Sequence, residues 1–321
     1  MSLPPIFDTL RAPIVAAPLF IISNPDLLLA ECKAGIIGSF PALNARPAEM
    51  LDEWLTRINE ELDAYNQANP DQPAAPYAVN QIVHRSNERL WPDVETCVKH
   101  KVPIIISSLG AREELNDAIH AYGGIVLHDV INDRFARKAI EKGADGLIAV
   151  AAGAGGHAGT TSPFALIQEI REWFDGPLLL SGSIATGDAV LAAQVLGADL
   201  AYIGSPFIAT EEANAEAAYK QMIVESHADD VLYTNYCAGV HGNYLKPSIV
   251  NSGLDPSDLP EADPSKMKFT SSGSEKHKTW KHIWGSGQGI GAVKEIVPAA
   301  NRVAELTEQY EAALGRMRRT G

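Results

Sequence analysis

The sequence predicts an α/β protein of the (β/α)8 TIM-barrel class, with a smaller C-terminal cap. Two observations support this prediction. Eight short apolar runs alternate with eight longer amphipathic stretches, which matches the number of strands and helices in such a barrel. Turns containing glycine and serine follow the seventh and eighth runs, where barrels of this class frequently bind phosphate groups.

The expected strands are nearly continuous apolar runs, as is typical of parallel strands buried on both faces. They cover residues 14–19, 35–40, 77–83, 102–108, 125–130, 146–151, 177–183 and 200–207. The helical patterns between them cover residues 25–33, 47–65, 87–99, 111–121, 133–141, 163–173, 187–196 and 211–225. A doubly wound open sheet is the alternative. It is disfavoured because residues 16–18, directly after the first strand pattern, lack the G-x-G-x-x-G of that fold.

The alternation of strand and helix patterns stops near His227. Residues 252–274 are rich in proline, aspartate, serine and glycine, which indicates an irregular loop. We therefore expect a barrel over residues 1–226 and a cap over residues 227–292 that folds across the barrel mouth. The remaining residues, 293–321, are expected to return to the barrel as a helix from residue 293 to about 314.

Charge and cysteine content exclude several classes of protein. The formal net charge of −14 disfavours nucleic acid and anionic membranes as partners. The three cysteines, Cys32, Cys97 and Cys237, are widely spaced and form no C-x-x-C pair, so neither a disulfide framework nor a zinc site is expected. The chain has no basic leader followed by an apolar stretch, and no run near the ~18 apolar residues of a membrane span. We expect a cytoplasmic protein.

Glycine and serine gather at the ends of the seventh and eighth strand patterns, at Ser181, Gly182, Ser183, Gly204 and Ser205. Glycine has no Cβ, so backbone N–H groups there can approach a phosphate closely. The first turn leads into the helical pattern over residues 187–196, whose N-terminus we expect to add free N–H groups. Tight turns without a ligand are the alternative. No G-x-x-x-x-G-K-[ST] motif is present, which disfavours nucleotide triphosphate hydrolysis.

His157 lies in a loop of small residues, with Gly155, Gly156, Ala158 and Gly159 around it. Because these neighbours have little side-chain bulk, a ligand can lie against the backbone and reach the imidazole. With an unperturbed pKa of ~6.5, the ring can take up a proton or donate a hydrogen bond to an anion. A structural or merely exposed histidine is the alternative. No H-x-H or H-E-x-x-H pattern accompanies it, so no metal is expected.

Few other reactive side chains stand at expected strand ends. There is no G-x-S-x-G elbow, and no strand end supplies a lysine for Schiff-base chemistry. The difficult chemical step therefore requires a cofactor. Asn80 ends the third strand pattern, where its amide can either contact the edge of a planar heterocycle or cap the strand.

Further polar and aromatic residues stand near the expected barrel mouth. Ser107, Ser108 and His128 occupy the ends of the fourth and fifth strand patterns. Trp284, Ser286 and Gln288 lie among glycines in the cap, which suits either a segment pressed against a flat ring or a structural glycine-rich turn. Lys281, also in the cap, can face solvent, another charge or the ligand.

Together these residues resemble the nitronate monooxygenase family, formerly called 2-nitropropane dioxygenases. The resemblance extends in order over nearly the whole chain, and its most specific element is the Gly-Gly-His-x-Gly loop around His157. The matching segments are residues 14–18, Asn80, residues 154–159, residues 181–183, residues 204–207 and residues 284–289.

The resemblance implies an FMN-dependent TIM barrel with a second, substrate-covering domain. The FMN phosphate would then contact the two strand-end turns, and the isoalloxazine ring would lie near the first and third strands. The residues implied in cofactor binding are Ala16, Ala17, Asn80, Gly155, Gly156, Ser181, Gly182, Ser183, Gly204, Ser205 and Gln288, and those in substrate binding are Trp284 and Ser286. His157 matches the family's active-site histidine, which deprotonates a nitroalkane carbon or holds the nitronate anion.

The implied reaction is the oxidation of alkyl nitronates by O2 to a carbonyl compound and nitrite. The chain departs from the family pattern at Leu19, where many relatives have methionine, and at His128, where several have lysine. The doublet Gly204-Ser205 replaces Gly-Thr. Two alternatives stay open: an NAD(P)H-dependent quinone or enoyl reductase on the same FMN barrel, and a flavin-binding protein without turnover. The sequence also leaves open the physiological substrate and a homo-oligomeric state.

Overall fold

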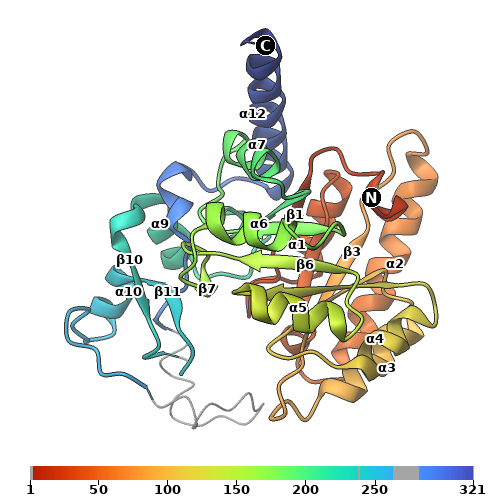
Figure 1. Cartoon of the computed structure of the whole chain (residues 1–321), viewed down its shortest axis with the longest axis horizontal. Coiled ribbons are helices and arrows are strands. Elements are labelled where there is room, and N and C mark those ends of the chain that lie inside the picture. The colour runs from red at the N-terminus through yellow and green to blue at the C-terminus, as the bar shows by residue number, and fades with distance from the viewer. Residues whose placement is uncertain (1–2, 238, 263–281, 321) are drawn as a thin grey trace.

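The computed structural model describes residues 3–237, 239–262 and 282–320, and eight parallel strands within them form a closed barrel (Figure 1). The strands follow the order β1-β9-β8-β6-β5-β4-β3-β2, and a parallel bridge between Val15 and Ile37 joins the two ends of this order. Their bounds are Ile14–Ala16 (β1), Gly38–Pro41 (β2), Tyr77–Ile82 (β3), Ile104–Ser108 (β4), Ile125–Val130 (β5), Gly146–Val150 (β6), Leu178–Ser181 (β8) and Leu200–Ile203 (β9). The predicted TIM barrel is confirmed.

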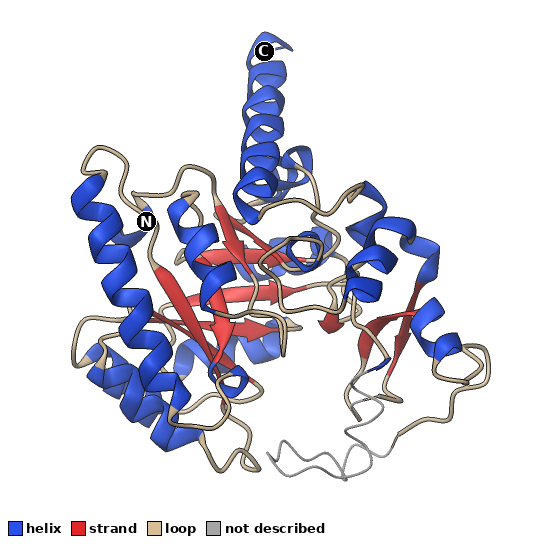
Figure 2. Cartoon of the chain, turned by 180° about the vertical axis from the view of Figure 1, so that it is seen from behind, coloured by secondary structure: helices blue, strands red, loops and turns tan. Residues whose placement is uncertain are grey.

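Helices follow the strands and lie around the outside of the barrel (Figure 2). Polar side chains start several of them. Asn24 accepts a hydrogen bond from the N–H of Leu27 in α1, and Thr186 accepts one from Ala189 in α7. The helix bounds are Pro25–Lys33 (α1), Met50–Ala68 (α2), Leu90–Lys99 (α3), Glu113–His120 (α4), Asp133–Glu141 (α5), Pro163–Arg171 (α6), Gly187–Leu196 (α7) and Ser205–Ile208 (α8).

The interior of the barrel is filled by side chains from alternate positions of the strands, because successive side chains of a strand point to opposite faces. The apolar members of this cluster are Phe7, Val15, Ile37, Ala78, Ile104, Ile106, Leu127, Ile148, Leu179, Leu200 and Tyr202. Two residues beyond the last inward-facing apolar residue of each strand, β3, β4 and β5 carry Asn80, Ser108 and Asp129. The same alternation therefore brings three polar side chains to the carboxyl end of the barrel interior.

A second, three-stranded antiparallel sheet stands beside the barrel, in the order β10-β11-β7 (Figure 1). Strands β10 (Val231–Thr234) and β11 (Gly242–Leu245) precede helix α10 (Lys246–Asn251) in the C-terminal part of the chain. Strand β7 (Gly156–His157) comes from the glycine-rich segment after β6, which the sequence predicted only as a loop. We retain the domain boundary at residue 226 as a proposal, although β7 precedes it and completes this sheet.

Two elements at the end of the barrel are shorter than expected. The helix expected over residues 211–225 begins only at Ala217 (α9, Ala217–Glu225). The N–H of Glu211 donates to the carbonyl oxygen of Val297, outside this helix. The strand expected over residues 200–207 ends at Ile203, because Pro206 already lies in the first turn of α8.

The final helix begins later than expected. It was predicted over residues 293–314, whereas α12 covers Ala299–Thr320 and starts directly after Pro298. A short 3-10 helix, η5 (Gln288–Ala292), comes before it. The helix packs against α7 and α1, and its C-terminal end projects away from the barrel (Figure 1). Among the described residues, no helix is both long and apolar enough to cross a bilayer.

Candidate active site

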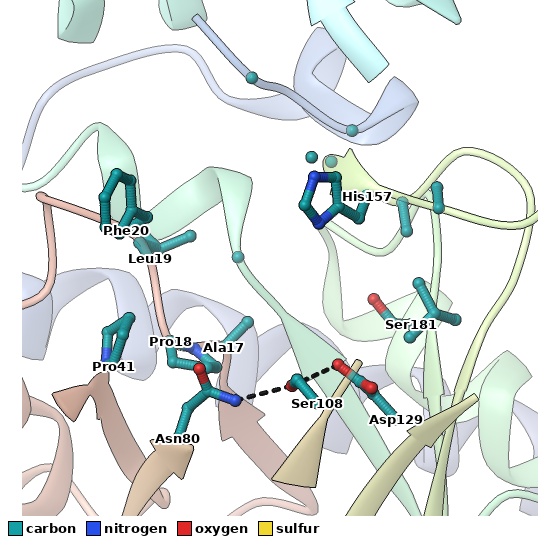
Figure 3. Close-up of a pocket in the computed structure, with 18 of the residues that line it drawn as sticks. Ala17, Pro18, Leu19, Phe20, Pro41, Asn80, Ser108, Asp129, His157 and Ser181 are labelled. Carbon is teal, nitrogen blue, oxygen red and sulfur yellow. Dashed lines mark hydrogen bonds between the residues drawn. The ribbon is translucent and has the colours of Figure 1, made fainter. Parts of the chain in front are cut away.

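A cavity of about 1270 Å³ opens at the carboxyl ends of the barrel strands, between the barrel and the three-stranded sheet. Figure 3 shows His157 on one side of it and the side chains of Asn80, Ser108 and Asp129 on the barrel side. Segments from β1, β8, β9, the β7 loop and the cap complete its lining. The cavity is therefore where chemistry is expected in a barrel of this class.

The turn after β8 has a backbone shape that requires glycine. Gly182 has a φ of +139°, and a Cβ there would lie 2.8 Å from the carbonyl oxygen of Ala152. The next residue, Ser183, has a φ of +57°, which places this turn in the left-handed region. Both residues line the cavity, so the turn brings backbone to its wall without a side chain at Gly182.

The turn after β9 contributes the other half of the same wall. A Cβ at Gly204 would lie 3.2 Å from a methyl carbon of Leu19, so the backbone passes close to the segment after β1. The hydroxyl of Ser205 accepts a hydrogen bond of 2.8 Å from the N–H of Gly287. This bond ties the barrel turn to the cap segment that closes over it.

The start of helix α7 does not contribute the free N–H groups that we expected. The N–H of Gly187 donates to Oε1 of Gln309 over 2.9 Å, and that of Ala189 donates to Oγ1 of Thr186 over 3.2 Å. A Cβ at Gly187 would lie 2.1 Å from the backbone nitrogen of Tyr310, so α12 covers this helix end. Two of the N–H groups at the start of α7 are therefore already used inside the protein.

His157 is held by the second sheet. It pairs with Gly242 of β11, while Gly156 pairs with Asn243 and has a φ of +64°. The amide of Asn243 also donates to the carbonyl oxygen of Ala154 over 2.7 Å, which fixes the loop before β7. Burial lowers the pKa of His157 to about 4, so the imidazole is neutral at pH 7 and able to accept a proton.

A chain of hydrogen bonds crosses the barrel side of the cavity. The amide nitrogen of Asn80 donates to Oγ of Ser108 over 2.7 Å, and Ser108 donates to Oδ2 of Asp129 over 2.5 Å. Burial raises the pKa of Asp129, and the neighbouring His128 and the Ser108 hydrogen bond act in the opposite direction. The ring nitrogens of His128 lie 2.8 Å from the carbonyl oxygen of Asp129 and 2.6 Å from that of Gly110.

The cap segment over residues 283–287 forms the outer wall. The ring of Trp284 stacks on that of Tyr219, with centroids 4.8 Å apart and planes 8° from parallel. The hydroxyl of Tyr219 donates to the carbonyl oxygen of Gly285 over 2.5 Å. The N–H of Ser286 donates to the carbonyl oxygen of Asn243, so this segment runs beside β11. One face of the indole is thus covered by Tyr219.

Most of the site residues expected from the sequence line this one cavity. They are Ala17, Asn80, Gly155, Gly156, His157, Ser181, Gly182, Ser183, Gly204, Ser205, Trp284 and Ser286. Ala16 does not line it: it is buried within β1, where its carbonyl oxygen accepts a hydrogen bond from Ser39. Gln288 is exposed and does not line it either, although its N–H donates to the carbonyl oxygen of Gly153, which does. Lys281 lies outside the described residues.

The lining residues that were not identified from the sequence include Asp129, Tyr202 and Tyr219. A signal was available for the first two. Each stands two positions after an apolar inward-facing residue of its strand, so counting alternate positions to the strand end would have placed both inside the barrel mouth. Tyr219 offers no comparable signal, because it belongs to α9 and reaches the cavity only through the packing of the cap.

The family model described as "Nitronate monooxygenase" matches residues 6–309. A nitronate monooxygenase of Neurospora crassa is 26% identical over an alignment that covers 94% of this chain and 90% of that protein. A nitronate monooxygenase of Paraburkholderia phytofirmans is 23% identical and covers 95% of this chain and 94% of its own.

Solved structures share the fold over the full length. A nitroalkane oxidase from Streptomyces ansochromogenes superposes with a TM-score of 0.81 at 22% identity, covering 98% of this chain and all of its own. FabK from Thermotoga maritima superposes with a TM-score of 0.77 at 20% identity, covering 100% of both chains. At these identities the structural likeness shows the fold alone.

Proposed function

The chain belongs to the nitronate monooxygenase family, and we propose that it is an FMN-dependent oxidoreductase that oxidises alkyl nitronates with O2 to a carbonyl compound and nitrite. The observation that carries this proposal is the position of His157 at the same cavity as the two glycine turns. A phosphate-bearing cofactor and a proton acceptor would then meet at one site. The named curated relatives support the activity class.

The residues present fit FMN. Two turns meet at one wall of the cavity, and a side chain at Gly182 would collide with the backbone at Ala152. Hydroxyl groups of Ser183 and Ser205 stand beside these turns, next to backbone that can approach a phosphate. The cavity of about 1270 Å³ exceeds the roughly 300–1,000 Å³ of a usual ligand pocket, so it has room for a cofactor together with a small substrate.

When bound, FMN would supply the transfer of electrons from the substrate to O2. The remaining work falls to side chains of the chain itself. Neutral His157 would take the proton from the carbon next to the nitro group of a nitroalkane, or hold a nitronate that is already formed. The imidazolium produced by proton transfer would lie beside the nitronate anion, and this opposite charge would offset the burial that otherwise disfavours the charged ring.

The cap would hold the substrate against the barrel and exclude water. Trp284 and Ser286 line the cavity, and Tyr219, which also lines it, supports the indole through the 4.8 Å stack. The bond between Gly287 and Ser205 fixes this segment to the turn that would carry the phosphate. Recognition of the substrate and of the cofactor would therefore be built on connected backbone.

Anaerobic mixing tests the proposal. The purified protein is reconstituted with FMN, and flavin absorbance is followed after addition of ethyl nitronate or of NADH. Rapid bleaching by the nitronate, with nitrite released once O2 is admitted, is the expected result. Bleaching by NADH alone would replace the proposal with a reductase, bleaching by neither with a flavin-binding protein. A chain that cannot bind FMN would refute the proposal altogether.

A further inference from the structure

We propose that Ser108 and Asp129 are positioning residues that hold the Asn80 amide in the direction set by the carbonyl oxygen of Ile106, so that its own oxygen faces the cavity and accepts a hydrogen bond from a ring N–H of the flavin. This inference rests on the proposed function, because FMN is the ligand that it concerns. The three side chains come from neighbouring strands β3, β4 and β5. In Figure 3 the amide nitrogen of Asn80 points to Ser108, and its oxygen points toward the cavity beside Ala17 and Pro18.

The direction of the Asn80 amide follows from its contacts. Its nitrogen lies 3.0 Å from the carbonyl oxygen of Ile106 and 2.7 Å from Oγ of Ser108. A carbonyl oxygen can only accept a hydrogen bond, so the atom facing Ile106 must be the NH2 group. Rotating the amide by 180° would place two acceptor oxygens against each other. Both amide hydrogens are therefore used inside the protein, and the amide oxygen is left to the cavity.

Asp129 sets the direction of the next bond. A hydroxyl has one hydrogen, and Ser108 gives it to Oδ2 of Asp129 over 2.5 Å, which leaves its oxygen lone pairs for the amide of Asn80. The hydrogen of Ser108 therefore faces Asp129 and not Asn80. The ring of His128, next to Asp129 in the chain, contacts the carbonyl oxygens of Asp129 and Gly110.

The flavin offers the matching donors. The oxidised ring carries one N–H, at N3, and reduction adds another at N5. An acceptor oxygen on the cavity wall can bind either group, whereas an inverted amide would present a donor to a donor. The N3–H group is present in both redox states, whereas N5–H is present only in the reduced one. The two donors can therefore be told apart by measuring FMN affinity in each state.

The test compares Ser108→Ala with Ser107→Ala. Ser107 precedes it on β4, is equally buried and bonds to Gly110, so it controls for loss of a buried hydroxyl. Dissociation constants are measured for oxidised FMN by fluorescence quenching and for reduced FMN anaerobically. We expect Ser108→Ala to weaken binding of at least one form about fivefold, as for one net hydrogen bond of ~1 kcal/mol, and Ser107→Ala to bind both as wild type.

The pattern identifies the donor. Equal weakening of both forms indicates N3–H, and weakening of the reduced form alone indicates N5–H. Unchanged affinity for both forms in Ser108→Ala would overturn the inference. If that variant does not fold, Ser108→Cys is used, because it keeps the shape of the side chain while the thiol hydrogen-bonds only weakly.

A double-mutant cycle separates positioning from general support of the barrel. In an Asn80→Ala background there is no amide left to orient, so adding Ser108→Ala should change FMN affinity no further. A full additional fivefold loss in that background would overturn the positioning role. Failure here is distinguishable from failure of the proposed function: wild-type protein that binds FMN and is bleached by nitronate keeps that function whatever the cycle shows.

Discussion

The low pKa of His157 predicts that acid destabilises the folded protein through this one side chain. In an unfolded chain a histidine titrates near pKa ~6.5, whereas burial lowers the pKa of His157 to about 4 in the folded protein. Because the folded value is the lower one, the stability that neutral His157 contributes is fully present above about pH 6.5. It is lost as the pH falls toward the folded pKa.

The magnitude follows from the separation of the two pKa values. Each unit of difference corresponds to ~1.4 kcal/mol of free energy, so the whole effect approaches about 3 kcal/mol below pH 4. Between pH 7 and pH 4.5 it amounts to about 2 kcal/mol. A loss of this size is a substantial fraction of the stability of an ordinary domain.

Urea unfolding of wild type and His157→Gln at several pH values between 7 and 4.5 measures this contribution. Other ionisable groups are common to both proteins, so they cancel when the two free energies of unfolding are subtracted. We expect wild type to lose about 2 kcal/mol more than the variant over this range. His282→Gln removes an exposed imidazole and serves as the control. Parallel pH profiles for wild type and His157→Gln would refute the reasoning.

Three further predictions concern activity, cofactor binding and stability. His157→Asn should retain bound FMN but lose at least ~10²-fold in turnover of a neutral nitroalkane, as expected for a positioned base; stopped-flow reduction measures this. Gly182→Val should lose FMN, because its Cβ would lie 2.8 Å from the carbonyl oxygen of Ala152; the ratio of flavin to protein absorbance measures this. Burial raises the pKa of Glu31 well above its usual value, so Glu31→Gln should stabilise the protein increasingly as pH rises above ~4.5, measured by urea unfolding.

Each of these has a contradicting result, and the Gly182→Val prediction also has a control variant. Gly123→Val tests strain alone, because Gly123 has a φ of +89° with open space around its Cβ position. A fully flavinylated Gly182→Val protein would argue against phosphate binding at this turn. Unchanged turnover in His157→Asn would remove that residue from the mechanism. For Glu31→Gln, a stability difference that is constant between pH 5 and pH 8 would show that the carboxyl is not held neutral in the folded state.

The sequence was sufficient to predict the barrel, because buried parallel strands are short apolar runs and their number is diagnostic. The glycine turns could be placed for a related reason: Gly182 and Gly204 each follow an apolar run directly, so their position at the barrel mouth depends only on local order along the chain. The cavity residues that lie at strand ends were therefore predictable from the sequence. Ala16 shows the limit, since it stands one position before Ala17 and alternation turns its side chain away from the cavity.

The cap could not be predicted in detail, since its structure depends on contacts between distant segments. Nothing in the local sequence of Gly156 and His157 indicates a strand, and they become one only by pairing with β11, more than 80 residues later in the chain. The covered start of α7 has the same origin, because Gln309 approaches it from the C-terminal helix. The Asn80–Asp129 chain likewise requires knowing which strands are neighbours.

Strand β7 makes the position of the His157 imidazole depend on the second sheet. His157 follows a barrel strand in the chain, but its backbone is hydrogen-bonded into the sheet that also carries β11 and the Trp284 segment. The group that would take the proton and the wall that would select the substrate therefore share one rigid support. Redesign of the cap for bulkier compounds will have to preserve the Gly242 pairing, or altered selectivity will come together with a misplaced base.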